Sequence, residues 1–198
     1  MKAEDTITRI RGALGPHLLD FRQKSERRVY LYIAPETVVE AAQLMFEEVG
    51  ARLQIATGVD NGQGIEVMYH WALDGEDCIA TVCTEVEHES AVLDSIADFC
   101  PAAEWIEREI WELLGVEFTG HPDLRHLLLS DDWPEGDYPL RRGIPGQARD
   151  DGRSGLDDSP DRHPGIRTAN IRDPEASEGT PRDGNAGADE DADRGVTP

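Results

Sequence analysis

The last fifty residues limit where this chain can fold. Residues 149–198 hold 13 acidic residues and 7 arginines among many small and polar residues. Their only large aliphatic residues are Leu156, Ile166, Ile171 and Val196. So few apolar side chains cannot bury enough surface to offset the entropy that is lost when a backbone becomes ordered. We therefore expect residues 149–198 to be an acidic disordered tail, and the fold to lie before it.

The acidity extends beyond this tail and excludes some classes of function. The chain has 41 acidic and 19 basic residues, and the tail accounts for only −6 of the net charge of −22. Because a phosphate backbone requires a basic surface, nucleic-acid binding is excluded, and direct binding to an anionic membrane is disfavoured. Such a lysine-poor, acidic chain is typical of a high-salt cytoplasm, and equally of a GC-rich genome with an acidic tail. No segment has the length and apolarity of a membrane span or signal peptide, so we expect a cytoplasmic chain.

The order of the helical and strand patterns predicts an α+β domain. Apolar residues at helical spacing predict helices at 3–14, at 35–49, within 90–99 and from Pro101 to Leu114. Runs of β-branched and aromatic residues predict strands at 28–33, 51–58, 65–73 and 78–86. Turn signals separate the last three strands, which favours antiparallel pairing. We expect a mostly antiparallel sheet with helices packed on one face, followed by an extended C-terminal arm and the tail.

These patterns divide the chain into four parts. They are an N-terminal helix and linker at 1–27, the α+β domain at 28–129, an arm at 130–148 and the tail at 149–198.

The chain has no recognisable pattern for holding a metal or a cofactor. Cys78 and Cys83 are five residues apart on a predicted strand, so their side chains point to opposite faces, and Cys100 has no partner at ligand spacing. No glycine-rich loop has the spacing of a dinucleotide or phosphate site. We therefore expect three buried cysteines and no cofactor bound by this chain.

The helix that ends at Leu114 is dense in ionisable groups, and two interpretations compete. Arg108 lies four residues from both Glu104 and Glu112, so it can bridge carboxylates along one face, and Arg125 is expected to return toward the same glutamates. Arginines beside glutamates keep the carboxylates ionised, which favours a structural clamp. The alternative is an independent soluble enzyme that uses Glu107, Glu109 and His121 as acid–base groups.

The segment that follows is expected to be an arm that docks on a partner. It contains two prolines, two aromatic residues and an arginine pair, and such aromatic and arginine residues dominate protein interfaces. The residues of this arm that we expect to contact a partner are Asp132, Trp133, Tyr138, Pro139, Leu140 and Arg141.

The helix that ends at Leu114 and the turn that follows it resemble the signature of the 30 kDa subunit family of respiratory NADH:quinone oxidoreductase, complex I. The signature is Glu-Arg-Glu, then an acid, two bulky apolar residues, a histidine, an arginine and an aliphatic residue at fixed spacing. The chain supplies every position, with Glu107, Arg108, Glu109, Glu112, Leu113, Leu114, His121, Arg125 and Leu127. Pro122 and Leu124 also match the family. Arg142 stands where the family usually has a lysine.

The resemblance implies a hydrophilic subunit without a redox cofactor of its own. Its partners would be the hydrogenase-like large subunit and the iron–sulfur subunits of the same complex, on the cytoplasmic side of the cell membrane. The membrane would be reached only through the complex. Iron–sulfur clusters, with FMN and NADH or a Ni–Fe centre, would be bound by those partner subunits.

Two alternatives to a complex I subunit are left open. The five-residue link between Trp133 and Pro139 looks more like the related subunits of membrane-bound nickel–iron hydrogenases and formate hydrogenlyases. A general acidic binding module that acts through the tail is the other.

Overall fold

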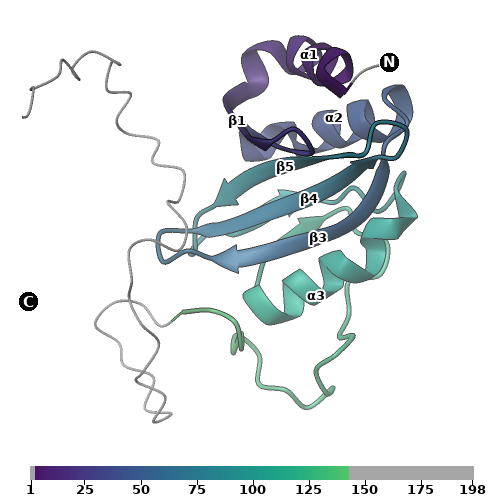
Figure 1. The fold of residues 1–198 in the computed structure, drawn as a ribbon. Helices are drawn as coiled ribbons and strands as arrows, with labels where there is room; N and C mark the ends of the chain where they lie inside the picture. Colours follow the sequence, from purple (N-terminus) through teal and green to yellow (C-terminus); the bar gives the residue numbers. More distant parts are fainter. Residues whose placement is uncertain (1–2, 143–198) are drawn as a thin grey trace, which may run out of the picture. The chain divides into compact units, whose positions relative to one another are not determined.

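A five-stranded sheet in the order β1-β2-β5-β4-β3 organises residues 3–142, the part of the chain that the computed structural model describes (Figure 1). The strands are β1 (Leu18–Ser25), β2 (Arg28–Ile33), β3 (Arg52–Asp60), β4 (Ile65–Leu73) and β5 (Cys78–Val86). The neighbouring strands are antiparallel except for β2 and β5, which are parallel. The prediction of a mostly antiparallel sheet in an α+β fold is confirmed. The predicted tail and the end of the predicted arm lie outside the described residues.

Three helices accompany the sheet among the described residues. They are α1 (Ala3–Leu14), α2 (Val38–Gln43), which continues as a π-helical turn over Leu44–Glu48, and α3 (Glu104–Leu114). Single 3₁₀ turns lie at Gly15–His17, Pro35–Thr37 and Pro101–Ala103. Two short strands, β6 (Val92–Asp94) and β7 (Glu117–Thr119), form a separate parallel pair.

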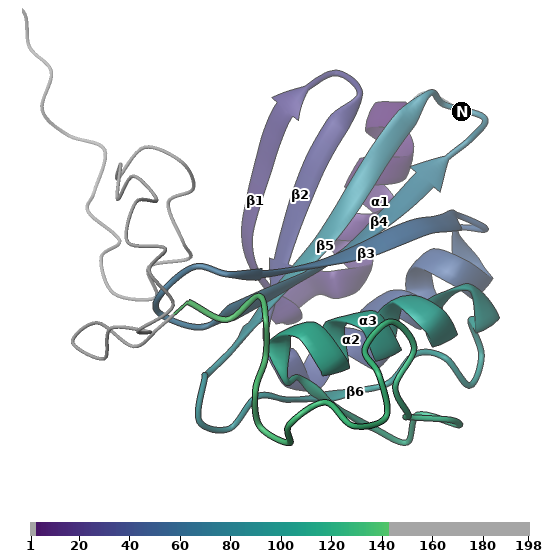
Figure 2. The ribbon, with the colours of Figure 1, turned by 90° about the horizontal axis from the view of Figure 1, so that it is seen from below.

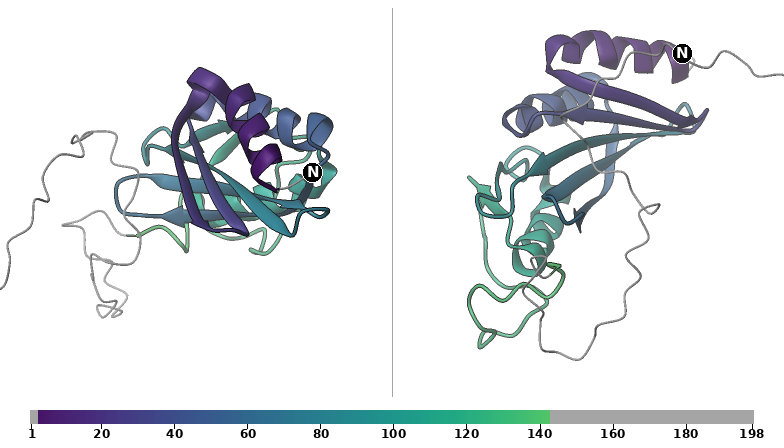
Figure 3. Two further views of the ribbon diagram at one scale, coloured as in Figure 1. Left: turned by 45° about the horizontal axis from the view of Figure 1, so that its top comes forward. Right: turned by 90° about the vertical axis from the view of Figure 1, so that its left-hand side faces the viewer.

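One face of the sheet carries the hydrophobic core. Alternate residues of β4, from Ile65 through Tyr69 to Trp71, are almost completely buried, as period-two side chains on a covered face should be. The same core includes Ile10 of α1 and Ile110 of α3. Figure 2 shows α3 running beside β3, and Figure 3 shows α1 over the β1–β2 hairpin. The helices therefore pack on one face, as predicted.

The approach of α3 to the sheet depends on a glycine in β3. A Cβ added at Gly58 would lie 2.4 Å from Leu114 Cδ1 and 3.2 Å from Ile110 Cγ2. Both of these side chains are buried, so they have little room to move away. Gly58 thus sets the distance between α3 and the edge of the sheet.

Two local predictions were wrong. The segment interpreted as a linker contains strand β1. Five of its eight residues are charged or polar, so the sequence showed no strand pattern there. Charged side chains are common on edge strands, and β1 is one. The helix expected within 90–99 is instead strand β6 followed by turns. Its N–H groups bond to distant residues instead of to a helix: the Ile96 N–H donates to the Glu107 carboxylate, and the Ser95 N–H donates to the Thr119 carbonyl.

Replacing Gly58 with alanine should lower the free energy of unfolding by about 1–3 kcal/mol, because the added methyl group overpacks the contact with Leu114. Urea unfolding of the purified chain measures this. Gly12→Ala in α1 is the matched control, since a Cβ there meets no atom within 4 Å and alanine favours the helix. Equal stability of Gly58→Ala and the unmodified chain would contradict the close approach.

Candidate functional site

Helix α3 carries three charged side chains that are almost completely buried. The exposed fractions of Glu107, Arg108 and Glu112 are 0%, 5% and 2%. The helix follows the proline-led turn at Pro101–Ala103 and ends at Gly115, whose φ of 68° is the left-handed conformation that glycine adopts readily. Because a buried charge is costly unless it is hydrogen-bonded, each of the three must have specific partners.

Arg108 and Glu112 hold the main chain of a segment that follows the helix. Arg108 donates from Nε and Nη2 to the carbonyl oxygens of residues 125–126, at 2.9 and 2.7 Å. The Glu112 carboxylate accepts the N–H groups of the three residues 127–129, at 2.7–3.1 Å. We call Arg108, Glu112 and the main chain of 125–129 the clamp. It holds five consecutive residues through two side chains from one helix face.

The clamp also determines the charge state of Glu112. Burial alone would raise its pKa, but the three N–H groups and the ring of His126, 3.3 Å away, together lower the pKa below its usual value. The His126 ring in turn packs on Trp111, with ring centroids 5.2 Å apart. Glu112 is therefore an ionised anchor, as the clamp interpretation expects.

The Glu107 carboxylate has different partners, and none of them among the described residues is an arginine side chain. Its carboxylate accepts the Tyr69 hydroxyl of β4 at 3.0 Å, the Ser95 hydroxyl and the Ile96 N–H at 3.1 Å. Burial raises its pKa despite these three bonds. The expectation that arginines hold down the pKa of the glutamates of this helix was wrong for Glu107, because burial raises its pKa and no arginine side chain opposes that. Its function is to join α3 to the sheet and to the segment before the helix.

His121 fixes the turn between β7 and the clamp. Its Nε2 lies 2.9 Å from the Glu104 carbonyl, and its Nδ1 accepts the Asp123 N–H at 3.0 Å. Both bonds form together only in a neutral ring with the proton on Nε2. Pro122 is exposed and Leu124 is half-buried in the same turn.

The sequence suggested that the Arg125 side chain returns to the glutamates of α3, but in the structure it does not. Its side chain is 73% exposed and pairs with Asp123 at 2.9 Å. Only its carbonyl oxygen takes part in the clamp. The expected bridge from Arg108 to two carboxylates is likewise replaced by bonds to carbonyl oxygens. Side-chain charges suggested the pairing, whereas the main chain supplies the partners.

The arm then returns to the C-terminal end of α3. Arg141 donates to the carbonyl oxygens of Leu114, Gly115 and His88, at 2.6, 3.2 and 3.0 Å, and so satisfies main-chain acceptors that a helix end leaves open. The Tyr138 ring lies so close to Gly115 that a Cβ there would be 2.4 Å from it.

Other arm residues are less anchored. Pro139 is half-buried, Leu140 is 56% exposed and Asp132 is exposed. Trp133 donates from Nε1 to the Asp137 carbonyl within its own turn. Docking of these arm residues, with Tyr138 and Arg141, on a partner stays a prediction.

Asp60 is a buried anchor that the sequence did not reveal. It is 4% exposed, and it accepts the Gly62 N–H and the Arg142 N–H at 2.8 Å each, with His88 Nε2 also 2.8 Å away. Its Asp-Asn-Gly context indicated only a turn. The second role depends on a residue 82 positions later, which no local pattern can detect.

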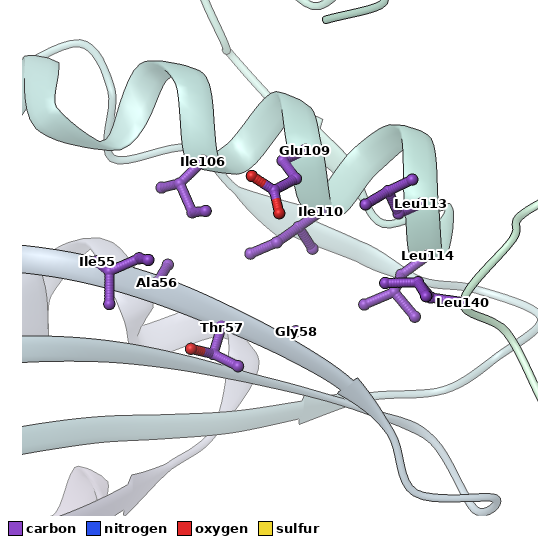
Figure 4. Close-up of a pocket in the computed structure, with 10 residues that line it drawn as sticks. All are labelled: Ile55, Ala56, Thr57, Gly58, Ile106, Glu109, Ile110, Leu113, Leu114 and Leu140. Atoms are coloured by element: carbon purple, nitrogen blue, oxygen red, sulfur yellow. The ribbon is translucent and has the colours of Figure 1, made fainter. Parts of the chain in front are cut away.

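The three residues of the acid–base alternative do not meet at one accessible site. Glu107 has no exposed surface, whereas Glu109 lines a groove between α3 and β3 whose lining does not include His121 (Figure 4). Glu107 has the raised pKa of a catalytic acid, but it has no route to a substrate in this conformation.

The described residues show neither a metal centre nor a membrane span. Within 3–142, no three histidine, cysteine or carboxylate side chains are grouped so that they could hold a metal ion. None of the helices in this range is long and apolar enough to cross a bilayer. Cys78, Cys83 and Cys100 are buried and free, as predicted, and burial raises the pKa of each thiol.

Comparison with known proteins identifies the family. Residues 31–150 match the family described as the 30 kDa subunit of respiratory-chain NADH dehydrogenase. An NADH-quinone oxidoreductase subunit from Roseiflexus sp. is 32% identical, over 70% of this chain and 82% of that one. This chain belongs to the 30 kDa subunit family. The clamp therefore occurs in a member of this family.

Similarity extends to other respiratory complexes. Formate hydrogenlyase subunit 5 of Escherichia coli is 31% identical over 63% of this chain and 23% of its own length. A chain of the membrane-bound sulfane sulfur reductase, an archaeal respiratory membrane complex, superposes with a TM-score of 0.59 at 26% identity, over 70% of this chain and 82% of that one. Several other curated relatives are much longer, and this chain spans 14–51% of their length.

The two buried glutamates should respond oppositely to amidation. Glu112→Gln should lower the free energy of unfolding at pH 7 by about 1–3 kcal/mol, because an amide NH₂ cannot accept the N–H groups of 127–129. Glu107→Gln should raise it, because glutamine can keep the bonds to Tyr69, Ser95 and Ile96 without a buried charge. Urea unfolding at pH 7 measures both, each serving as the other's control.

The pH dependence follows from the signs of the two shifts. The lowered pKa of Glu112 stabilises the fold above the unfolded value of about 4.3, and this is lost as pH falls below it. The raised pKa of Glu107 costs stability as pH rises above about 4.3. The advantage of Glu107→Gln should therefore grow as pH rises above this value. An advantage that is constant with pH would show that Glu107 does not titrate in this range.

Proposed function

We propose that this chain is a hydrophilic subunit, without an active site of its own, of a membrane-associated electron-transfer complex related to NADH:quinone oxidoreductase. Family membership over residues 31–150 is the observation that carries the proposal. The buried clamp supports it, because its two charged side chains bind the chain's own main chain and are almost completely buried. In this role the chain helps to assemble and position a hydrogenase-like large subunit.

The clamp gives this role a physical basis. The contacts of Arg108 and Glu112 fix the path of 125–129, and those of Asp60 and Arg141 hold residues 141–142 of the arm. The residues between these two anchors, 130–140, are mostly exposed. Trp133 is half-buried in this stretch, and Leu128, whose N–H is held in the clamp, is 61% exposed just before it. A loop fixed at both ends loses little further entropy when it docks on a partner.

Cofactors and membrane attachment belong to the other subunits in this proposal. The partners are the large subunit and the iron–sulfur subunits, and they bind the clusters together with FMN and NADH or a Ni–Fe centre. The chain reaches the cytoplasmic side of the membrane only through these partners. Its net charge of −22 supports contact with proteins and disfavours direct contact with an anionic lipid surface.

The second candidate is the equivalent subunit of a membrane-bound nickel–iron hydrogenase or formate hydrogenlyase. It is favoured by the five-residue link between Trp133 and Pro139 and by the similarity to formate hydrogenlyase subunit 5. Mass spectrometry of proteins that copurify with the chain from its native membranes separates the two. An NADH-binding flavoprotein subunit supports the first candidate, and a large subunit with paired cysteine motifs for nickel supports the second.

Weakening the clamp should reduce assembly. Arg108→Lys keeps the charge but loses the planar fork that reaches two carbonyl oxygens, so the 125–129 segment should loosen. We expect faster amide exchange at 127–129 in the isolated chain and several-fold less copurifying large subunit. Hydrogen exchange and quantitative mass spectrometry measure the two effects.

Arg125→Ala is the matched control, because its exposed side chain does not take part in the clamp. Exchange at 127–129 should be unchanged in this variant. Normal assembly of Arg108→Lys with a demonstrably loosened segment would contradict the role of the clamp. Recovery of the chain alone from gently solubilised membranes would overturn the proposed function itself.

A further inference from the structure

A groove lies between α3 and the outer strand β3. It has a volume of about 170 Å³. Apart from the Glu109 carboxylate, the side chains that line it are mostly apolar: Ile55, Ala56 and Thr57 of β3, Ile106, Ile110, Leu113 and Leu114 of α3, and Leu140 of the arm. Figure 4 shows the α3 side chains and Ala56 of β3 facing the space between helix and strand, whereas Ile55 and Thr57 extend from the other side of the strand. Ile55 is 50% exposed at the edge of this groove.

Glu109 is the one charged residue that lines this groove, and it lacks a partner within residues 3–142. No hydrogen bond or ion pair joins its carboxylate to another described residue, in contrast to Glu107 and Glu112 of the same helix. A half-buried carboxylate beside apolar side chains forms strong charge-assisted bonds with a matching cation.

Trp105 makes that cation more specific. It lies four residues before Glu109 on α3, so the two side chains are neighbours on the helix surface. Trp105 is 68% exposed, the largest exposed fraction among the large hydrophobic residues described. A guanidinium group can pair with a carboxylate and stack on an indole ring at the same time, which an ammonium group does less well. The pair therefore favours arginine.

Strand β3 supplies the third element. It is the last strand of the sheet, and its outer edge has no strand partner among the described residues. An edge strand presents unpaired N–H and C=O groups to which another extended segment can add, with side chains reaching pockets alongside. Here the groove lies directly beside that edge.

We propose that β3 and the groove bind an extended segment of another subunit, which adds to the sheet edge, places apolar side chains against Ile106 and Leu113 of α3, and pairs an arginine with Glu109 beside Trp105. The inference rests on the proposed function as a subunit of a complex. Charge favours a basic occupant, because the chain carries −22 and the groove contributes a free carboxylate. The chain's own residues 143–198 are less suited, since they continue the acidic composition.

Hydrogen exchange of the full chain, alone and within the native complex, tests the edge pairing. Amides of Ile55–Val59 that point outward should exchange at least about tenfold more slowly in the complex, because pairing protects them. Unchanged exchange on assembly would overturn the proposal.

Charge reversal tests the arginine. Glu109→Lys should lower the amount of chain in the complex about tenfold, since a repelled interfacial cation weakens binding strongly. Glu47→Lys is the matched control, because it makes the same charge change at an exposed residue without a partner in the described chain. Thermal unfolding of both isolated variants shows that the fold is intact. Equal assembly of the two variants would overturn the proposal.

The remaining outcomes also overturn the proposal, and the first two of them identify another occupant. Protection of β3 in the isolated chain that disappears when the chain is cut after Arg142 would assign the groove to residues 143–198. Protection that increases with chain concentration, together with a dimer on gel filtration, would assign it to a second copy. A chain that copurifies with its partners while β3 exchanges freely would refute this inference and leave the proposed function standing. A chain that copurifies with nothing would refute the proposed function first.

Discussion

Burial of Arg108 and Glu112 on one face of α3 is the constraint on which the C-terminal half of the structure depends. Two charges cannot stay in the interior without several hydrogen bonds each, and the protein supplies them from the main chain of 125–129. The segment is thereby held in a single path although it contains no helix or strand. Displacing the segment 125–129 would leave both charges buried without these partners.

Helix α3 performs three tasks because its side chains point in three directions. Ile110 and Leu114 pack in the core against Gly58, while Arg108 and Glu112 hold the following segment. Trp105 and Glu109 lie between these two faces: Trp105 is exposed, and Glu109 lines the groove. In a family whose relatives belong to respiratory complexes, one helix thus connects the core, the internal arm and the surface that we propose for a partner.

Local patterns identified most of the sheet and the correct helix for the site. The ranges of β2, β4 and β5 and of α1 agree with the sequence because their apolar periodicity and flanking turns are strong. The pattern failed for β1, an edge strand with charged residues, and for the segment around Ile96, whose amide is taken by Glu107. The sequence also singled out Glu107, Arg108 and Glu112, which the structure buries, but it suggested side-chain partners for Arg108 and Glu112 where the main chain supplies them.

The sequence by itself determined the family, the α+β class and the location of the charged helix, because these follow from residue spacing along the chain. Only the tertiary structure decided what each charge contacts. Arg108 meets carbonyl oxygens, Glu107 meets Tyr69 from 38 positions earlier, and Asp60 meets the Arg142 amide 82 positions later. Main-chain groups are present at every residue, so the sequence does not distinguish the ones that will be partners. Folding selects them by bringing particular carbonyl and N–H groups within hydrogen-bond distance of a buried charge.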